Sequence, residues 1–380
     1  MSHALLSPSS AARWIACPPS AIAESFYPDS TSEYAAEGTL AHEICELKLS
    51  EKYLGKVVRV AMNRLKKESL YQSEMEGYTD QYVDFVTKSY IAFDSKPYMA
   101  VEKRLDISEW VPEGYGTGDC ILIGGNVLHI IDFKYGKGVP VYPNGNPQMM
   151  LYALGAYNAY KILYPITMIR MSIVQPRLDS FETSEITIVD LLDWAEKTVR
   201  PAAELAINGR GTRAAGAHCR FCRAKALCRT RAEFNMALEP AAGKDPGALT
   251  AAEVGDYLKR SADIVSWAND LKDYALTACL DGKEIPGWKA VEGRSNRTWS
   301  DQDAAFNFII DQGFAKKTKL YEKKPITLTA VEKLIGKTEF SQLADYIVKP
   351  PGKPTLAEES DTRQAITNRT TAKEAFADKE

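Results

Sequence analysis

The sequence lacks the features that would send a chain into or across a membrane. No apolar run approaches the length of a transmembrane helix, and the N-terminus lacks the charged-then-apolar order of a signal peptide. It also lacks a basic excess. The 380 residues carry a net charge of −3, which argues against a protein that coats nucleic acid with its whole surface but allows a local basic channel. We therefore expect a cytoplasmic globular protein that is long enough for two domains.

Disulfides are not expected either, because the seven cysteines are odd in number and lie in a large cytosolic chain. Their spacing is more informative. Cys219, Cys222 and Cys228 form a C-x2-C-x5-C cluster, and Cys17 lies far upstream. Thiols at this spacing favour a metal centre. The residues alone are compatible with a structural zinc site in which His218 replaces one thiolate.

The most informative stretch is a predicted β-hairpin. Residues 120–123 and 127–131 are apolar runs joined by a Gly-Gly-Asn turn. Asp119 opens the first strand, Asp132 ends the second, and Lys134 follows two residues later, on the same face as Asp132. Two carboxylates and a lysine at strand ends suit phosphodiester hydrolysis, with Mg²⁺ or Mn²⁺ held by the carboxylates and the ammonium steadying the nucleophile or the developing charge.

A helix is predicted directly after Pro147. Gln148 and Tyr152 are four residues apart on it, so they share one face, which we expect to look onto the metal site. A D-x-K sequence alone is more often a solvated turn than a catalytic motif, and Tyr152 alone would suit a core position. The ordered set of motifs is far less common by chance.

The order G-x-x-D, hairpin, D-x-K and Q-x-x-x-Y resembles the PD-(D/E)xK nuclease superfamily. It is most similar to the nuclease domains of RecB and AddB and to the CRISPR-associated iron–sulfur exonucleases. The resemblance implies a restriction-endonuclease-like α/β core with a mixed central sheet flanked by helices. It also implies Mg²⁺- or Mn²⁺-dependent hydrolysis of DNA, with exonuclease activity as the expected mode.

The resemblance assigns a role to each motif residue. Asp119 and Asp132 would bind the metal, and Phe133 would add its backbone carbonyl. Lys134 would assist the attacking water. Gln148 and Tyr152 would orient the scissile phosphate or Lys134.

Two further residues are candidates for the same site. His42 lies in Gly-Thr-Leu-Ala-His, which resembles the first motif of RecB-like nucleases and would place the imidazole at the metal. A lone histidine is more often a core or surface residue. Glu102 lies on the predicted strand before the hairpin, where some relatives carry a metal-binding carboxylate, and it equally fits a surface charge.

The relatives also carry four cysteines that flank the nuclease core and hold a [4Fe-4S] cluster. The resemblance therefore assigns Cys17, Cys219, Cys222 and Cys228 to such a cluster, with Zn²⁺ as the alternative. Seven basic residues and no acid lie between positions 210 and 231. They would either neutralise phosphates or offset the negative charge of the cluster thiolates.

Three regions are expected along the chain. Residues 1–242 form the nuclease core, 248–348 an α-rich accessory region that begins with a long helix, and 349–380 a flexible tail. The whole pattern resembles an uncharacterised family of phage and prophage proteins in the RecB-like group. That implies a role in phage-type DNA recombination, repair or replication, with DNA ends or single strands and a phage single-strand-binding or annealing protein as partners. A non-catalytic DNA-binding module and an RNase remain open alternatives.

Overall fold

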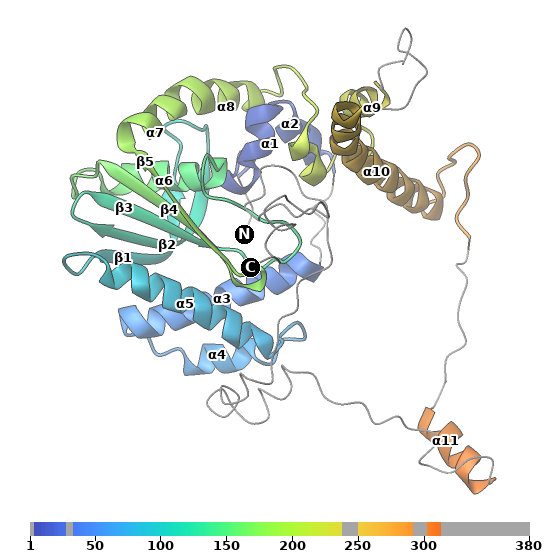
Figure 1. The fold of residues 1–380 in the computed structure, drawn as a ribbon, viewed down its shortest axis with the longest axis horizontal. Helices are drawn as coiled ribbons and strands as arrows, with labels where there is room; N and C mark the ends of the chain where they lie inside the picture. Colours follow the sequence, from blue (N-terminus) through green and yellow to red (C-terminus); the bar gives the residue numbers. More distant parts are fainter. Residues whose placement is uncertain (1–3, 28–32, 238–249, 292–301, 313–380) are drawn as a thin grey trace, which may run out of the picture. The chain divides into compact units, whose positions relative to one another are not determined.

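The fold is built around a five-stranded mixed sheet flanked by helices (Figure 1), which confirms the predicted α/β class. This computed structural model describes residues 4–27, 33–237, 250–291 and 302–312. The strands lie in sequence order, and all neighbours pair antiparallel except β3 and β4. They are β1 (Tyr98–Asp106), β2 (Tyr115–Gly124), β3 (Val127–Phe133), β4 (Met168–Gln175) and β5 (Ser180–Thr187). Helix α6 (Pro147–Tyr160) joins the parallel pair, because parallel strands require a crossover connection.

The predicted hairpin is present as β2 and β3. Gly124 pairs with Val127, and Gly125 between them has φ +57°, a left-handed conformation that glycine adopts without strain. Pairing continues to Cys120 opposite Ile131 and ends there.

Past that last pair the two strands diverge. β2 stays paired with β1 as far as Tyr115, while β3 stays paired with β4 as far as Phe133. Asp119 and Asp132 are the next residues beyond the last β2–β3 pair. We call this place, where the sheet opens between β2 and β3, the fork. A carboxylate from each strand therefore starts at the fork.

Helices cover both faces of the sheet (Figure 1). One core packs Ile121 and Ile123 with α6, and the other packs Cys120 and Leu122 with α3 and α5, as the two-residue period of a strand requires. The first face is covered by α6, η1 (Pro8–Ser10), α1 (Ala11–Ala16), α7 (Ile188–Trp194), the π-helical turn η3 (Ala195–Val199) and α8 (Arg200–Ile207). The second face is covered by α3 (Glu33–Leu54), α4 (Arg59–Leu65) and α5 (Glu74–Ile91).

The N-terminal segment packs against residues almost two hundred positions later. Glu24, on α2 (Ser20–Ser25), is 5% exposed and accepts a hydrogen bond from the backbone N–H of Arg223 at 2.8 Å. Its carboxylate also lies 3.1 Å from Arg13. A buried carboxylate needs such partners, so these contacts fix the N-terminus to the segment that holds η4 (Ala217–Phe221) and α9 (Arg229–Met236).

The chain divides into two units after Val291, which differs from the predicted boundary at 242–248. The reason is a buried guanidinium. Arg231 is fully buried and pairs with Asp270 at 2.6 Å and Asp263 at 2.9 Å, both on α10 (Ala251–Leu280). Separating such a pair would leave an uncompensated buried charge, so α10 belongs to the first unit. The predicted long helix itself is confirmed.

The second unit, residues 292–380, has one described element, α11 (Gln302–Asp311). The predicted tail at 349–380 lies outside the described residues, as does most of the accessory region after α11. In the part of the chain that the structure describes, no helix combines the length and the apolar character needed to cross a membrane.

Candidate active site

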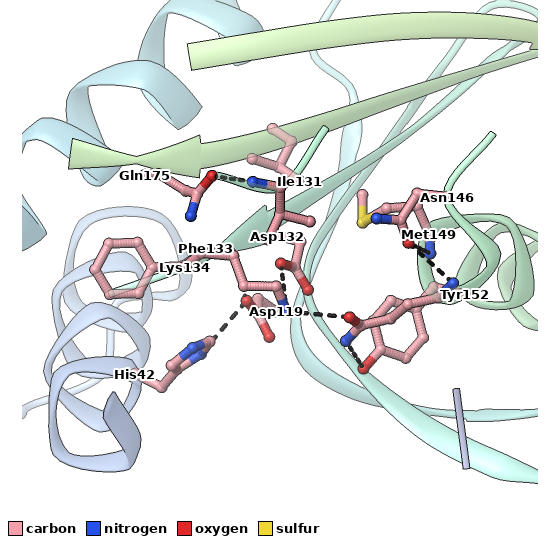
Figure 2. Close-up of polar contacts among 12 residues, drawn as sticks. His42, Asp119, Ile131, Asp132, Phe133, Lys134, Asn146, Met149, Tyr152 and Gln175 are labelled. Carbon is pink, nitrogen blue, oxygen red and sulfur yellow. Dashed lines mark hydrogen bonds and ion pairs between the residues drawn. The ribbon is translucent and has the colours of Figure 1, made fainter. Parts of the chain in front are cut away.

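The two predicted carboxylates meet in the fork between β2 and β3 (Figure 2). The backbone N–H of Phe133 donates a hydrogen bond to Asp119 Oδ2 at 2.7 Å, so a side chain replaces the missing ladder bond between the strands. Asp132 is 2% exposed. The fork therefore holds one carboxylate bound to the backbone of the neighbouring strand and a second carboxylate that is almost fully buried.

Lys134 and α6 close one side of the fork (Figure 2). Lys134 Nζ lies 3.0 Å from Asp132 Oδ2 and donates to Gln148 Oε1 at 3.2 Å. Gln148 Nε2 in turn donates to the Tyr152 hydroxyl at 3.0 Å, which confirms that these two side chains share a face. Asn146 caps the helix by accepting the Gln148 backbone N–H at 3.0 Å. The ammonium is thus positioned by a chain of hydrogen bonds from α6.

His42 approaches the fork from α3, on the opposite side. Its Nδ1 lies 3.4 Å from Asp119 Oδ2, and its ring meets the Phe133 ring edge-on with centroids 5.3 Å apart. The histidine is therefore oriented by an aromatic neighbour and a carboxylate. Its predicted place beside the acids is confirmed.

Glu102 lies at the site itself, whereas its sequence context fitted a surface charge equally well. It lies on β1 between Val101 and Lys103, which pair normally with β2, but the pairing is interrupted at Glu102 itself. Its φ is +48°, a left-handed value that costs a residue with a Cβ on the order of 1 kcal/mol or more. Ligand atoms of His42, Glu102 and Asp119 all lie within 4.8 Å of one another. The strained backbone thus accompanies a carboxylate placed at the site.

Burial and neighbouring charges shift the pKa values of the acidic residues at the site in different directions. Burial alone would raise the pKa of Asp119, but His42, Lys134 and the Phe133 N–H together hold it below its ordinary value. Burial dominates at Asp132 and raises its pKa. Burial, with Asp119 adding to it, raises the pKa of Glu102 to about 7. Neighbouring carboxyls with divergent pKa values are common at functional sites.

The same acidic residues shift the pKa values of His42 and Lys134. Burial would lower the pKa of His42, but Asp119 raises it above its ordinary value. Burial would likewise lower the pKa of Lys134, and Asp132 and Asp119 raise it instead. The same concentration of negative charge therefore raises the pKa of both side chains.

The donor set fits a divalent cation with a preference for oxygen. His42, Glu102 and Asp119 form the only group of three such ligand residues found this close together in the described part of the chain. Asp132 Oδ2 is buried and forms an ion pair with the Lys134 ammonium at 3.0 Å. Carboxylate oxygens with one imidazole suit Mn²⁺ and Mg²⁺.

The cysteines are brought together in part. His218 lies beside Cys17 and Cys219, and the interaction with these two thiols raises the pKa of His218 to about 10. Burial raises the pKa of Cys222 to about 12. No three sulfur atoms lie within 4.8 Å of one another among the described residues. The structure thus joins Cys17 to the cluster segment across the chain, while the four-thiol centre that would include Cys228 stays a prediction.

Gln175 is a positioning residue that the sequence did not reveal. It ends β4, is 2% exposed, and lies close to the fork in Figure 2. Its Oε1 accepts the backbone N–H of Val141 at 2.7 Å, and its Nε2 donates to the Val139 carbonyl at 3.1 Å. It thereby fixes the loop that connects Lys134 to α6. A glutamine at the end of an apolar strand gives no signal of this role.

Fold and site together define an α/β protein with a cluster of acids, histidine and lysine where two central strands separate. The chain belongs to the family described as "Protein of unknown function (DUF2800)", which matches residues 3–364. A solved structure described as "Crystal structure of SSO0001" is similar over 59% of this chain and 84% of that chain, with 13% identity and a TM-score of 0.25.

Proposed function

We propose that this protein is a cytoplasmic, metal-dependent deoxyribonuclease that hydrolyses phosphodiester bonds, most directly as an exonuclease in phage-type DNA recombination, repair or replication. One observation carries the proposal. The fork brings Asp119, Asp132 and Lys134 together, with His42 and Glu102 beside them. This is the combination of groups that phosphodiester hydrolysis uses.

The acidic residues and the histidine at the fork are the proposed metal ligands. His42, Glu102 and Asp119, whose ligand atoms lie together, would hold the metal, and Asp132 and the Phe133 carbonyl are further ligands implied by the resemblance. Bound Mg²⁺ or Mn²⁺ supplies Lewis-acid polarisation of the phosphate and a more acidic water.

Lys134 acts from the α6 side of the fork. Its ammonium, positioned by the Gln148 amide, would stabilise the attacking hydroxide and the charge that develops on the phosphate. Tyr152 holds the amide through its hydroxyl, so the lysine need not reorganise during the reaction.

A non-catalytic DNA-binding module on the same fold is the competing function. A binding module has no need to hold the carboxyls of Glu102 and Asp119 this close together, because neighbouring carboxylates repel each other unless a metal or a proton lies between them. The complete set of acids with the lysine therefore favours the enzyme. The same chemistry would serve an RNase, so the choice of nucleic acid is decided by experiment.

The test uses protein purified without oxygen and three labelled substrates: linear DNA, covalently closed circular DNA, and RNA of the same sequence. With Mg²⁺ or Mn²⁺ we expect linear DNA to be degraded to short products while circles and RNA persist. EDTA should abolish the reaction. Degradation of the circular DNA would indicate an endonuclease. Selective degradation of the RNA would indicate an RNase. No cleavage of any substrate with either metal would contradict the proposal.

A further inference from the structure

A cavity of about 680 Å³ lies between α2 and the segment that leads from the end of α8 into α9. It is formed by parts of the chain far apart in sequence, which Glu24 and Arg223 hold together. None of the residues at the fork lines it, and Cys228, one of the four cysteines assigned to the predicted metal centre, lies on its wall. Its lining residues include Ile22, Phe26, Tyr27, Arg213, Leu227 and Arg229.

The charge of this cavity is positive. Arg213 and Arg229 are its charged residues, and no acid lines it. Neither guanidinium forms an ion pair or a hydrogen bond with another described residue. By contrast, Lys225 and Arg231, from the same basic segment, are neutralised by Asp270 at 2.7 and 2.6 Å. The structure thus separates the cations that pair with α10 from Arg213 and Arg229, which line the cavity. Arg213 also contributes to lowering the pKa of the Cys17 thiol.

The cavity also presents aromatic surface. Phe26 is 80% exposed at the end of α2, a costly position for a phenyl ring in water, and Tyr27 follows it. Unpaired arginines beside an exposed ring match a strand of nucleic acid, in which phosphates meet the cations and a base stacks on the ring. In a duplex the base faces are covered by their neighbours. The volume lies in the range of small-ligand sites, about 300–1,000 Å³.

We propose that this cavity binds single-stranded DNA, with Phe26 stacking on a base and Arg213 and Arg229 contacting phosphates. The inference deepens the proposed function, on which it rests, by adding a site for the unpaired part of the substrate. The N-terminal segment connects the cavity with the active site. Pro8, near its start, and the Tyr152 ring both lie against Gly116.

Binding is measured by fluorescence anisotropy with a labelled oligo(dT) strand, using the full chain in EDTA so that no cleavage occurs. Phe26→Ala should weaken binding about tenfold, the effect expected for one stacked base. The double variant Arg213→Gln, Arg229→Gln should reduce the slope of log affinity against log salt by about 1.4, since each phosphate contact on a single strand contributes about 0.7.

Matched controls are Phe308→Ala, which removes an exposed ring on α11, and Arg59→Gln, which removes an exposed cation on α4. Both should bind oligo(dT) as the parent does. Unchanged melting temperature and metal content in the cavity variants would show that the fold and the nearby cysteine segment are intact.

Parent-like affinity and salt slope in the cavity variants would overturn the inference. An equal loss for duplex DNA without an end would overturn it too, because it would indicate a general electrostatic surface. Failure of the proposed function looks different: the parent would fail to cleave any substrate with metal, whatever the cavity variants bind.

Discussion

Replacing Asp132 with asparagine is expected to lower the rate of DNA cleavage by on the order of 10³-fold, with little change in the free energy of unfolding. Asparagine has nearly the same shape, so the packing of this 2%-exposed side chain is kept. It lacks the negative charge that a metal and the Lys134 ammonium require. Initial rates on end-labelled DNA at saturating Mg²⁺, together with a denaturant titration, measure both quantities.

The matched control is Asp84→Asn, which removes an exposed acid on α5 and should leave the rate unchanged. Lys134→Ala should lose activity as Asp132→Asn does, because it removes the group that stabilises the developing charge. Full activity in both fork variants would mean that the fork is not where the bond is broken.

The second large effect is expected at Cys17. If four cysteines hold a [4Fe-4S] cluster, protein prepared without oxygen should be brown and contain about four irons per chain. Cys17→Ala should lose the colour and the iron and should lower the melting temperature. A metal that joins Cys17 to the segment around Cys219 closes a very long loop and adds its binding free energy to folding, so its loss is costly.

Cys279→Ala is the control, because this thiol lies on α10, outside the four assigned cysteines. It should keep both iron and colour. If the protein is colourless and contains one Zn²⁺ per chain, the four cysteines form a zinc site and not a [4Fe-4S] cluster. If the protein contains no metal and the Cys17→Ala variant has the melting temperature of the parent, both the cluster and the zinc assignments are wrong.

The parts of the site that follow local periodicity could be predicted from the sequence. The Gly-rich turn and two apolar runs specify the hairpin, and period-2 alternation puts Asp132 and Lys134 on one face. The helical period does the same for Gln148 and Tyr152, whose hydrogen bond the structure shows. Each of these relations extends over a few residues, where backbone geometry leaves few alternatives.

The parts that depend on distant contacts could not be predicted. The place of Glu102 depends on a left-handed backbone conformation that no neighbouring glycine or turn residue announces. Gln175 acts by holding a loop that precedes it by more than thirty residues. The division after Val291 differs from the predicted boundary because a Gly- and Pro-containing segment resembles a linker, whereas the pairs of Arg231 with Asp263 and Asp270 connect its two sides.

The most direct test of the central claim is the affinity of the fork for Mn²⁺, measured by electron paramagnetic resonance of the free ion. We expect the parent protein to bind Mn²⁺ and the affinity to fall at least about tenfold in Asp119→Asn and in Glu102→Gln, since each variant removes one carboxylate ligand. Asp84→Asn should bind as the parent does. Equal Mn²⁺ affinity in the parent and both ligand variants would contradict the account, because the fork would then hold no catalytic metal.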